Sequence, residues 1–434
     1  MSTSAVASQG STEANSTGSG AEVTPAGSTV TSTAAALVET AENHVDVEDY
    51  EVDLAAAVLI TFNGDSITAS GAGVTVSGTT VTISAPGDSR LSGSLTDGQV
   101  VVNSMGDGAV QLILDGITLN SSTSAPIYIM DADKVILLLA DGTQNAITDA
   151  ASYTYPSAEV DELNAAIFSN ADLSIAGNGS LTVTGNFNDG INVDDGLVIA
   201  GGTLNVTAAD DGIRGKDYLR VEGGTLTISA QGNGLKADNA EDPELGYIAV
   251  SAGTLNITVR GDALSAQTNV AVTGGDFALT TGGGSGNLVA ETEPAKGIKG
   301  DEGVVIDGGT FSIHAADDAL HSNGTVTVNN GSFTLASDDD AVHADQSVTI
   351  NGGEIAVTQS YEGLESAVIT INGGALHITS SDDGVNVAGG VDGSGMMRGM
   401  GGPGGEQVDF GGRGGPGGRG ARALELASVT DQWH

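Results

Sequence analysis

The chain has 434 residues, of which 56 are acidic and 13 are Lys or Arg, giving a formal net charge of -43. This balance excludes nucleic acid and anionic membranes as direct partners, and it suits a protein that binds cations. The absence of Cys excludes disulfides, thiolate zinc sites and cysteine nucleophiles. No apolar run approaches the roughly 20 residues of a membrane-spanning helix, so we expect no membrane span.

Residues 1–53 begin with a Ser/Thr/Ala/Gly-rich tract and end in an acidic stretch. The tract has no apolar period, which is typical of a flexible linker. It also lacks a basic region followed by an apolar stretch, so we expect no leader peptide within this chain. Extracellular mature proteins often begin with such a tract, and we therefore expect an extracellular or cell-surface protein.

A repeat unit of about 22 residues dominates the chain from residue 201 onward. Units such as GGTLNVTAADDGIRGKDYLRVE and GGTFSIHAADDALHSNGTVTVN each contain three short runs with strand-like alternation. Longer units carry insertions at 240–246 and 282–295. The units begin at Gly201, Gly223, Ala252, Gly274, Gly308, Asn330, Gly352 and Gly373.

One unit cannot bury its apolar face alone, but stacked units share a continuous core. The sequence therefore predicts an all-β fold, a single-stranded parallel β-helix with three strands in each coil of about 22 residues. An inward apolar column supports this register over nine levels: Ile191, Ile213, Leu235, Leu264, Ile298, Leu320, Val342, Leu364 and Val385.

Residues 54–390 form the predicted β-helix domain. Less regular coils between residues 67 and 175 are interpreted as its first turns, with an excursion at 153–164. Residues 391–434 are rich in Gly and poor in apolar residues, so we expect this tail to be disordered.

The turn before the second strand of each coil carries a repeated pair of acidic residues. Stacked coils would place these carboxylates about 4.8 Å apart, where they repel one another unless a cation lies between them. Ca²⁺ with its oxygen ligands fits such a column, although Asp and Asn also favour turns for local reasons. The candidate calcium ligands are Asp189, Asp210, Asp211, Asp317, Asp318, Asp339, Asp340, Asp382 and Asp383.

A basic strip lies just beyond these turns. It predicts contact with the carboxylates of an acidic polysaccharide, but the same cations are also explained by neutralisation of neighbouring Asp residues. For the two His residues, a solvated stacked pair is the preferred interpretation. The candidate carbohydrate-binding residues are Arg214, Lys216, Lys236, Lys296, Lys299, His321 and His343.

Several motifs resemble a bacterial family of secreted carbohydrate-binding parallel β-helix proteins with cellulose- and pectin-binding members. They are GGTLNVTAADDGIRGKD, GNFNDGINVDD, ADDALHSNGTVTVNNGSF and SYEGLESAVITINGG. The resemblance covers about residues 59–390 and implies a right-handed single-stranded parallel β-helix. It also implies bound calcium at the matching Asp residues, binding to acidic plant-type polysaccharide, and similarity to pectate lyases. The Ala295–Lys296 turn lacks the acidic pair, and the Gly-rich tail departs from the family pattern.

Three functions compete. The first is a calcium-stabilised carbohydrate-binding protein or adhesin for acidic, pectin-like polysaccharide, with cellulose as a further candidate ligand. The second is a subunit of fibres that form by end-to-end self-association, because an uncapped solenoid end exposes strand edges. The third is a calcium-dependent polysaccharide lyase, which needs a Lys or Arg base near the ion. We expect a binding protein with no catalytic residues.

Overall fold

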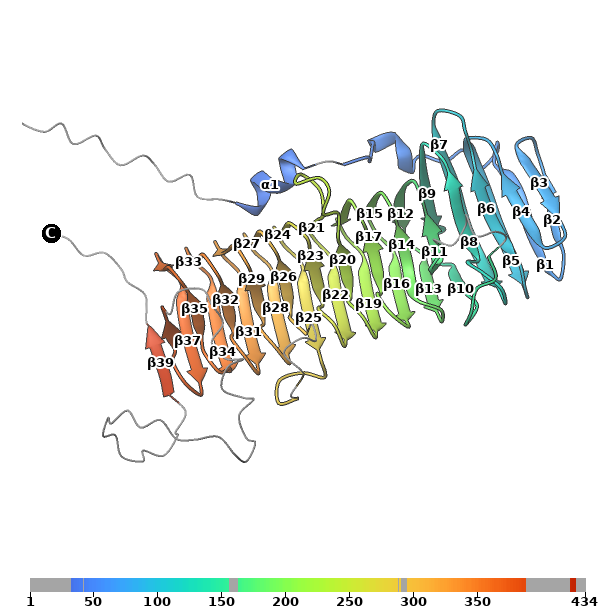
Figure 1. Ribbon diagram of the computed structural model, residues 1–434. Coiled ribbons are helices and arrows are strands. Elements are labelled where there is room, and N and C mark those ends of the chain that lie inside the picture. The colour runs from blue at the N-terminus through green and yellow to red at the C-terminus, as the bar shows by residue number, and fades with distance from the viewer. Residues whose placement is uncertain are drawn as a thin grey trace, which may run out of the picture. The chain divides into compact units, whose positions relative to one another are not determined.

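The computed structural model describes residues 33–41, 43–155, 163–287, 289, 295–387 and 422–426. The predictions for residues 1–32, and for most of the tail after residue 387, lie outside the described residues. The described chain is almost entirely β-structure, stacked coil upon coil (Figure 1). Its one α-helix, α1 (Ala34–Thr40), is short, so no helix in the described part of the chain is long and apolar enough to cross a membrane.

The N-terminal end of the stack contains two antiparallel strand pairs. β1 pairs with β2, and β3 pairs with β4, before the parallel pattern begins. Strand β7 is long because it pairs with strands of two columns of the later coils, and β5 is long because it pairs along both parts of β7. The bounds are β1 (Val58–Gly64), β2 (Ile67–Ser70), β3 (Val74–Ser77), β4 (Thr80–Ile83), β5 (Gly87–Leu95), β6 (Gln99–Asn103), β7 (Ala109–Asn120), β8 (Ile127–Asp131) and β9 (Lys134–Leu139).

Each later coil contributes one strand to each of three parallel columns, which confirms the predicted parallel β-helix. The first column contains β10 (Gln144–Thr148), β13 (Ser180–Gly185), β16 (Thr203–Ala208), β19 (Thr225–Ala230), β22 (Thr254–Val259), β25 (Asp276–Thr281), β28 (Thr310–Ala315), β31 (Ser332–Ser337), β34 (Glu354–Gln359) and β37 (Ala375–Ser380).

The second column carries the candidate site. After β8 it contains β11 (Ala165–Ser169), β14 (Asp189–Val193), β17 (Ile213–Gly215), β20 (Leu235–Ala237), β23 (Leu264–Ala266), β26 (Ile298–Gly300), β29 (Leu320–Ser322), β32 (Val342–Ala344), β35 (Leu364–Ser366) and β38 (Val385–Asn386).

The third column closes each coil. After β9 it contains β12 (Asp172–Gly177), β15 (Gly196–Ile199), β18 (Tyr218–Val221), β21 (Tyr247–Val250), β24 (Asn269–Val272), β27 (Gly303–Ile306), β30 (Thr325–Val328), β33 (Ser347–Ile350) and β36 (Ile369–Ile371).

The core consists of aliphatic side chains stacked in register. In β16 the buried residues alternate with exposed Thr and Asn, as the sequence pattern predicts. The predicted inward column is confirmed, because Ile191 pairs with Ile213, Ile213 with Leu235, and the same register continues to Leu364 and Val385. Phe277, Phe311 and Phe333 stack in the first column with ring centroids 4.5 Å apart.

Residues 33–41 and 43–53, the described part of the predicted flexible segment, differ from that prediction because they pack against the coils. We call them the N-terminal strap. α1 and the short 3-10 helix η1 (Val47–Tyr50) belong to it. The backbone N–H of Ala35 donates to Asp307, which follows β27, while Lys134 at the start of β9 bonds Asp46 and Asp49. The strap therefore spans several coils, and apolar side chains of the third column lie beneath it.

The C-terminal tail also differs from the prediction in one place. Strand β39 (Arg422–Leu426) pairs antiparallel with β37, so it covers the last strand edge of the first column. Figure 1 shows it at the end of the stack. Among the described residues, no strand continues the second column beyond β38 or the third beyond β36.

Candidate functional site

A ladder of polar side chains runs along the turns between the first and second columns. We call it the turn ladder. In four successive steps a side-chain oxygen accepts a backbone N–H from the next coil. Asp189 accepts from Asp211 at 3.0 Å, Asp211 from Asn233 at 2.7 Å, Asn233 from Asp262 at 2.9 Å, and Asp262 from Lys296 at 2.8 Å. Of the four donor residues, Asp211 and Asp262 are buried and the other two are half-buried, so these N–H groups need acceptors, and the ladder supplies them.

The first acidic cluster combines Asp189, Asp210 and Asp211. Their ligand oxygens lie within 4.8 Å of one another; Asp189 and Asp211 are buried and Asp210 is exposed. Burial, followed by the charge of Asp211, raises the pKa of Asp189 to about 7. Burial and Asp211 also raise the pKa of Asp210. The cluster therefore holds more negative charge than its own protein partners neutralise.

Gly232 leaves the space into which two of these carboxylates converge. It stands in the next coil at the position equivalent to Asp210. A Cβ at Gly232 would lie 2.4 Å from one oxygen of Asp210 and 2.5 Å from one oxygen of Asp211. Any larger residue would collide with the cluster. The donor set consists of carboxylate oxygens alone, which is the chemistry that Ca²⁺ prefers.

The second acidic cluster, Asp317, Asp318 and Asp339, already contains a protein cation. The Lys296 ammonium bonds Asp317 and lies 3.4 Å from Asp318. His321 Nδ1 lies 2.8 Å from the same oxygen of Asp318, Oδ2. Burial acts to raise the pKa of Asp318, but Lys296 and His321 hold it well below its usual range. Lys296, which the sequence places at a break in the acidic column, therefore acts as its counter-ion.

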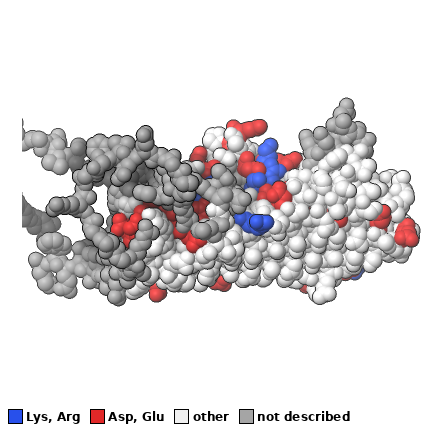
Figure 2. Space-filling view, turned by 60° about the horizontal axis from the view of Figure 1, so that its bottom comes forward, with Lys and Arg blue, Asp and Glu red and all other residues white. Residues whose placement is uncertain are grey.

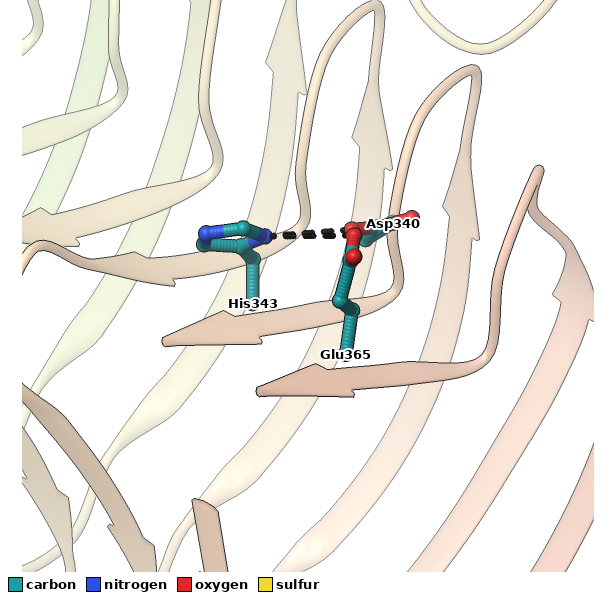
Figure 3. A group of neighbouring side chains, drawn as sticks. All are labelled: Asp340, His343 and Glu365. Atoms are coloured by element: carbon teal, nitrogen blue, oxygen red, sulfur yellow. Dashed lines mark hydrogen bonds and ion pairs between the residues drawn. The ribbon is translucent and has the colours of Figure 1, made fainter. Parts of the chain in front are cut away.

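The remaining predicted acidic ligands lie in different surroundings. Asp340 is buried beside His343 and Glu365, and these three residues form the third group with ligand atoms within 4.8 Å (Figure 3). Asp382 and Asp383 lie on the last described coil and are exposed. They form no three-residue cluster within the described part of the chain, so the structure does not bring them into a common site.

The basic strip is in the predicted register but is occupied by ion pairs. Arg214 pairs with Lys236 across adjacent strands, and Lys299 with His321. Arg214 donates to Asp194 and Asp238, and Lys236 donates to Asp211 at 2.9 Å. Lys299 lies 3.0 Å from Asp301, whereas Lys216 has no ion pair with a described side chain. The strip is a network with neighbouring Asp residues, as the neutralisation interpretation expects. Figure 2 shows basic side chains gathered beside acidic ones.

The two His residues of the strip differ from the prediction. Their rings stack with centroids 5.1 Å apart, but His343 is only 2% exposed and cannot meet a polymer at the surface. His321 is also largely covered and bonds Asp318 and Asn323. Sequence reasoning found no third ligand near this pair. The missed signal is the register itself, because β32 pairs His343 with Glu365 of β35.

Comparison with known proteins agrees with this fold. The family model described as carbohydrate-binding domain-containing protein matches residues 77–341, and the chain belongs to this family. A carbohydrate-binding domain-containing protein of Acetivibrio thermocellus is 47% identical over 198 residues, which cover 46% of this chain and 69% of that protein. The matched family region includes the first two acidic clusters.

A solved structure shares the fold. It is described as the polysaccharide lyase-like protein from C. thermocellum in a gadolinium derivative. It superposes with a TM-score of 0.50 and 31% sequence identity, over 63% of this chain and 96% of that chain. The family membership, together with this fold, supports a carbohydrate-binding role for this protein.

Proposed function

We propose that this chain is a calcium-stabilised, extracellular or cell-surface protein that binds acidic, pectin-like polysaccharide. The observation that carries the proposal is the cluster of Asp189, Asp210 and Asp211 on successive coils, with space left by Gly232. Two of the three carboxylates are buried without enough protein cations, and the third reaches the surface. Such a cluster is stabilised by a hard divalent cation with oxygen ligands.

Each residue of the cluster would have a separate task. Asp189 and Asp211 would hold the ion through Oδ2, where the ion would replace the bond from Lys236 to Asp211. Their Oδ1 atoms would keep accepting backbone N–H groups of the turn ladder. The exposed Asp210 would complete the protein part of the site. A bound Ca²⁺ supplies a positive charge that a uronate carboxylate can approach, since Ca²⁺ accepts six to eight oxygen ligands. Arg214 and Lys236 lie beside it and would contact further carboxylates of an extended chain.

The same contacts favour binding over elimination. A lyase needs a neutral Lys or an equivalent base within reach of the departing proton. Partial burial alone would lower the pKa of Lys236, but the carboxylates of Asp211 and Asp238 raise it. Arg214 is likewise held in its charged form by Asp238 and Asp194. Side chains held so firmly as cations are poor bases.

The experiment is a pull-down with polygalacturonate and, separately, with cellulose, at fixed ionic strength with calcium or with a chelator. We expect calcium-dependent retention on polygalacturonate and little change on cellulose. Asp189→Asn combined with Asp210→Asn should remove the calcium dependence. Asp107→Asn should not, because Asp107 is exposed and lies near the N-terminal end of the stack. Retention that is equal with calcium and chelator would contradict the proposal.

The enzyme alternative is tested with the same polymer. Elimination creates a double bond conjugated to the uronate carboxylate, which absorbs in the near ultraviolet. We expect no rise in absorbance during prolonged incubation with polygalacturonate and calcium. Steady product formation that disappears in a Lys236→Ala or Lys299→Ala variant would instead establish a lyase.

End-to-end self-association is a second candidate function. At the end of the third column, Val368, just before β36, is 54% exposed and Ile371, in β36, is 38% exposed. β39 covers only the edge of the first column. Exposed apolar residues beside an open strand edge favour pairing with another chain. Sedimentation analysis of the full chain and of Val368→Lys tests this: concentration-dependent assembly should be lost in the variant, and a monomeric wild type would exclude it.

A further inference from the structure

The group formed by Asp340, His343 and Glu365 differs from the two acidic clusters because it contains an imidazole nitrogen. All three side chains are buried. His343 Nδ1 lies 3.1 Å from an Asp340 oxygen and 3.7 Å from an oxygen of Glu365. Figure 3 shows the ring edge and both carboxylates converging from β32, its preceding turn and β35.

One oxygen of this group has no partner. By the pattern of the turn ladder, Asp340 Oδ1 should accept the backbone N–H of Glu362, as Asp318 accepts that of Asp340 at 2.9 Å. Instead, Asp340 Oδ1 is buried and without a hydrogen bond among the described residues, and Glu362 Oε2 is in the same condition. The register between β31 and β34 shifts just before this turn. Buried polar atoms of this kind require a partner, such as an ion.

The outer ring nitrogen of His343 is already oriented. Nε2 lies 3.2 Å from an oxygen of Asp345, so it donates its proton to that carboxylate. In the neutral imidazole this leaves the lone pair of Nδ1 directed at Asp340 and Glu365. A carboxylate that orients a His in this way is the usual outer partner of a metal-bound imidazole.

The equivalent group one coil earlier gives a useful comparison. There, His321 and Asp318 have the same relation, but the Lys296 ammonium supplies the positive charge. No described Lys or Arg side chain lies within ion-pair distance of Asp340 or Glu365. Asp340 and Glu365 are thus two buried carboxylates that share one imidazole.

We propose that Asp340, His343 and Glu365 form a zinc site, with His343 Nδ1 and one oxygen from each carboxylate as ligands. One nitrogen and two carboxylates are a ligand set of transition metals, whereas Ca²⁺ takes oxygen ligands. A divalent cation would balance both carboxylates, and the unpartnered Oδ1 leaves Asp340 free to bind it through either oxygen. Asp345 is a positioning residue. The site is independent of the proposed calcium cluster and of polysaccharide binding.

Zinc binding to the full chain tests the proposal, by titration calorimetry with millimolar calcium present throughout. We expect one Zn²⁺ per chain, and Co²⁺ in its place should show the visible absorption of a low-coordinate site. His343→Asn and Glu365→Gln should each weaken zinc binding by about 100-fold or more, because loss of an outer-shell partner alone costs about 10–100-fold. Asp345→Asn should therefore weaken it by about 10-fold or more.

The matched control is His314→Gln. His314 is exposed on β28, which belongs to the first column, whereas the group lies in the second column. It should leave stoichiometry and affinity unchanged. Glu365→Gln preserves size and serves if His343→Asn fails to fold by circular dichroism. Three results would overturn the proposal: no zinc bound by the folded wild type, equal binding by both folded variants, or displacement of zinc by calcium at equal concentration. A folded wild type that binds no zinc would mean that a proton alone bridges the group.

Discussion

Two lysines of the basic strip show how burial of the partner decides the role of a charge. Lys236 pairs with Asp211, whose side chain is 6% exposed, whereas Lys299 pairs with Asp301, which is 25% exposed. Removal of a cation from a buried carboxylate leaves that carboxylate desolvated and unpaired, while a solvated carboxylate recovers water. The same residue type in the same column therefore contributes differently to stability.

We expect Lys236→Ala to lower the free energy of unfolding by about 1–3 kcal/mol and Lys299→Ala by less than about 1 kcal/mol. Urea denaturation of both variants in the presence of a chelator measures the difference. Calcium should restore part of the loss in Lys236→Ala, because an ion at the Asp189 cluster replaces the missing charge. Equal losses in the two variants would show that burial of the partner is not the deciding factor.

A second residue-scale feature is the aromatic stack of the first column. Phe311 stacks on both Phe277 and Phe333, whereas Phe277 stacks on Phe311 alone among the described rings. Truncation of a buried Phe to Ala costs about 3–5 kcal/mol, and each aromatic pair adds about 0.5–1.5 kcal/mol. Phe311→Ala should therefore destabilise the protein more than Phe277→Ala, by about the value of one pair. Thermal melts of both variants, read against wild type, test this order.

At the scale of elements, the N-terminal strap is the segment that covers apolar side chains of the third column. His44 holds its centre: the backbone N–H of His44 donates to Tyr218, and the ring nitrogens lie 2.8 Å from the Tyr218 hydroxyl and from Ser174. Burial, followed by the charge of Lys134, lowers the pKa of His44 to about 4. The neutral ring is therefore the form that docks the strap.

The strap should loosen in acid. Because the folded pKa of His44 is about 4 and the unfolded value is 6.5, the unfolded chain binds the proton first as the pH falls. The stability from His44 is complete above about pH 6.5 and is lost toward pH 4, up to about 3 kcal/mol. Hydrogen exchange of residues 33–53 at pH 7, 5 and 4 should show the loss. His44→Ala should be loose already at pH 7, and a strap equally protected at all three pH values would contradict the mechanism.

At the scale of the whole molecule, the net charge of -43 makes cations part of the stability of the fold. Without a metal, the cluster of Asp189 keeps a proton to limit repulsion. Because the folded pKa of Asp189 is about 7 and the ordinary value is 3.8, the native state binds more protons between these values. The metal-free protein should therefore lose stability as pH rises from about 4 to about 7.

We expect calcium to reverse this trend. At a free concentration 100 times the dissociation constant, one bound ion adds about 2.7 kcal/mol to the free energy of unfolding. Thermal melts at pH 5, 6, 7 and 8, with calcium or with chelator, should diverge most at high pH. NaCl at matched ionic strength controls for screening, and Asp189→Asn should reduce the divergence. Coincident melts at pH 8 would contradict the calcium assignment.

Much of the fold follows from periodicity alone. A unit of about 22 residues with an inward apolar column predicts which residues stack, because parallel strands repeat one register from coil to coil. The columns of Ile191, Arg214 and Asp189 were predictable for this reason. The Asp189, Asp210 and Asp211 cluster was predictable as a place where carboxylates meet.

What the sequence by itself determined is therefore the repeat, the core and the order of residues along each column. Only the tertiary structure decided which charged groups become partners. Lys296 lies within the second acidic cluster, Lys236 pairs with Asp211, and Asp340 and Glu365 both lie beside His343. It also decided that residues 33–53 dock on distant coils. The physical reason is that register is a local and repetitive property, whereas the surroundings of a charge depend on atoms from several coils and from segments remote in the chain.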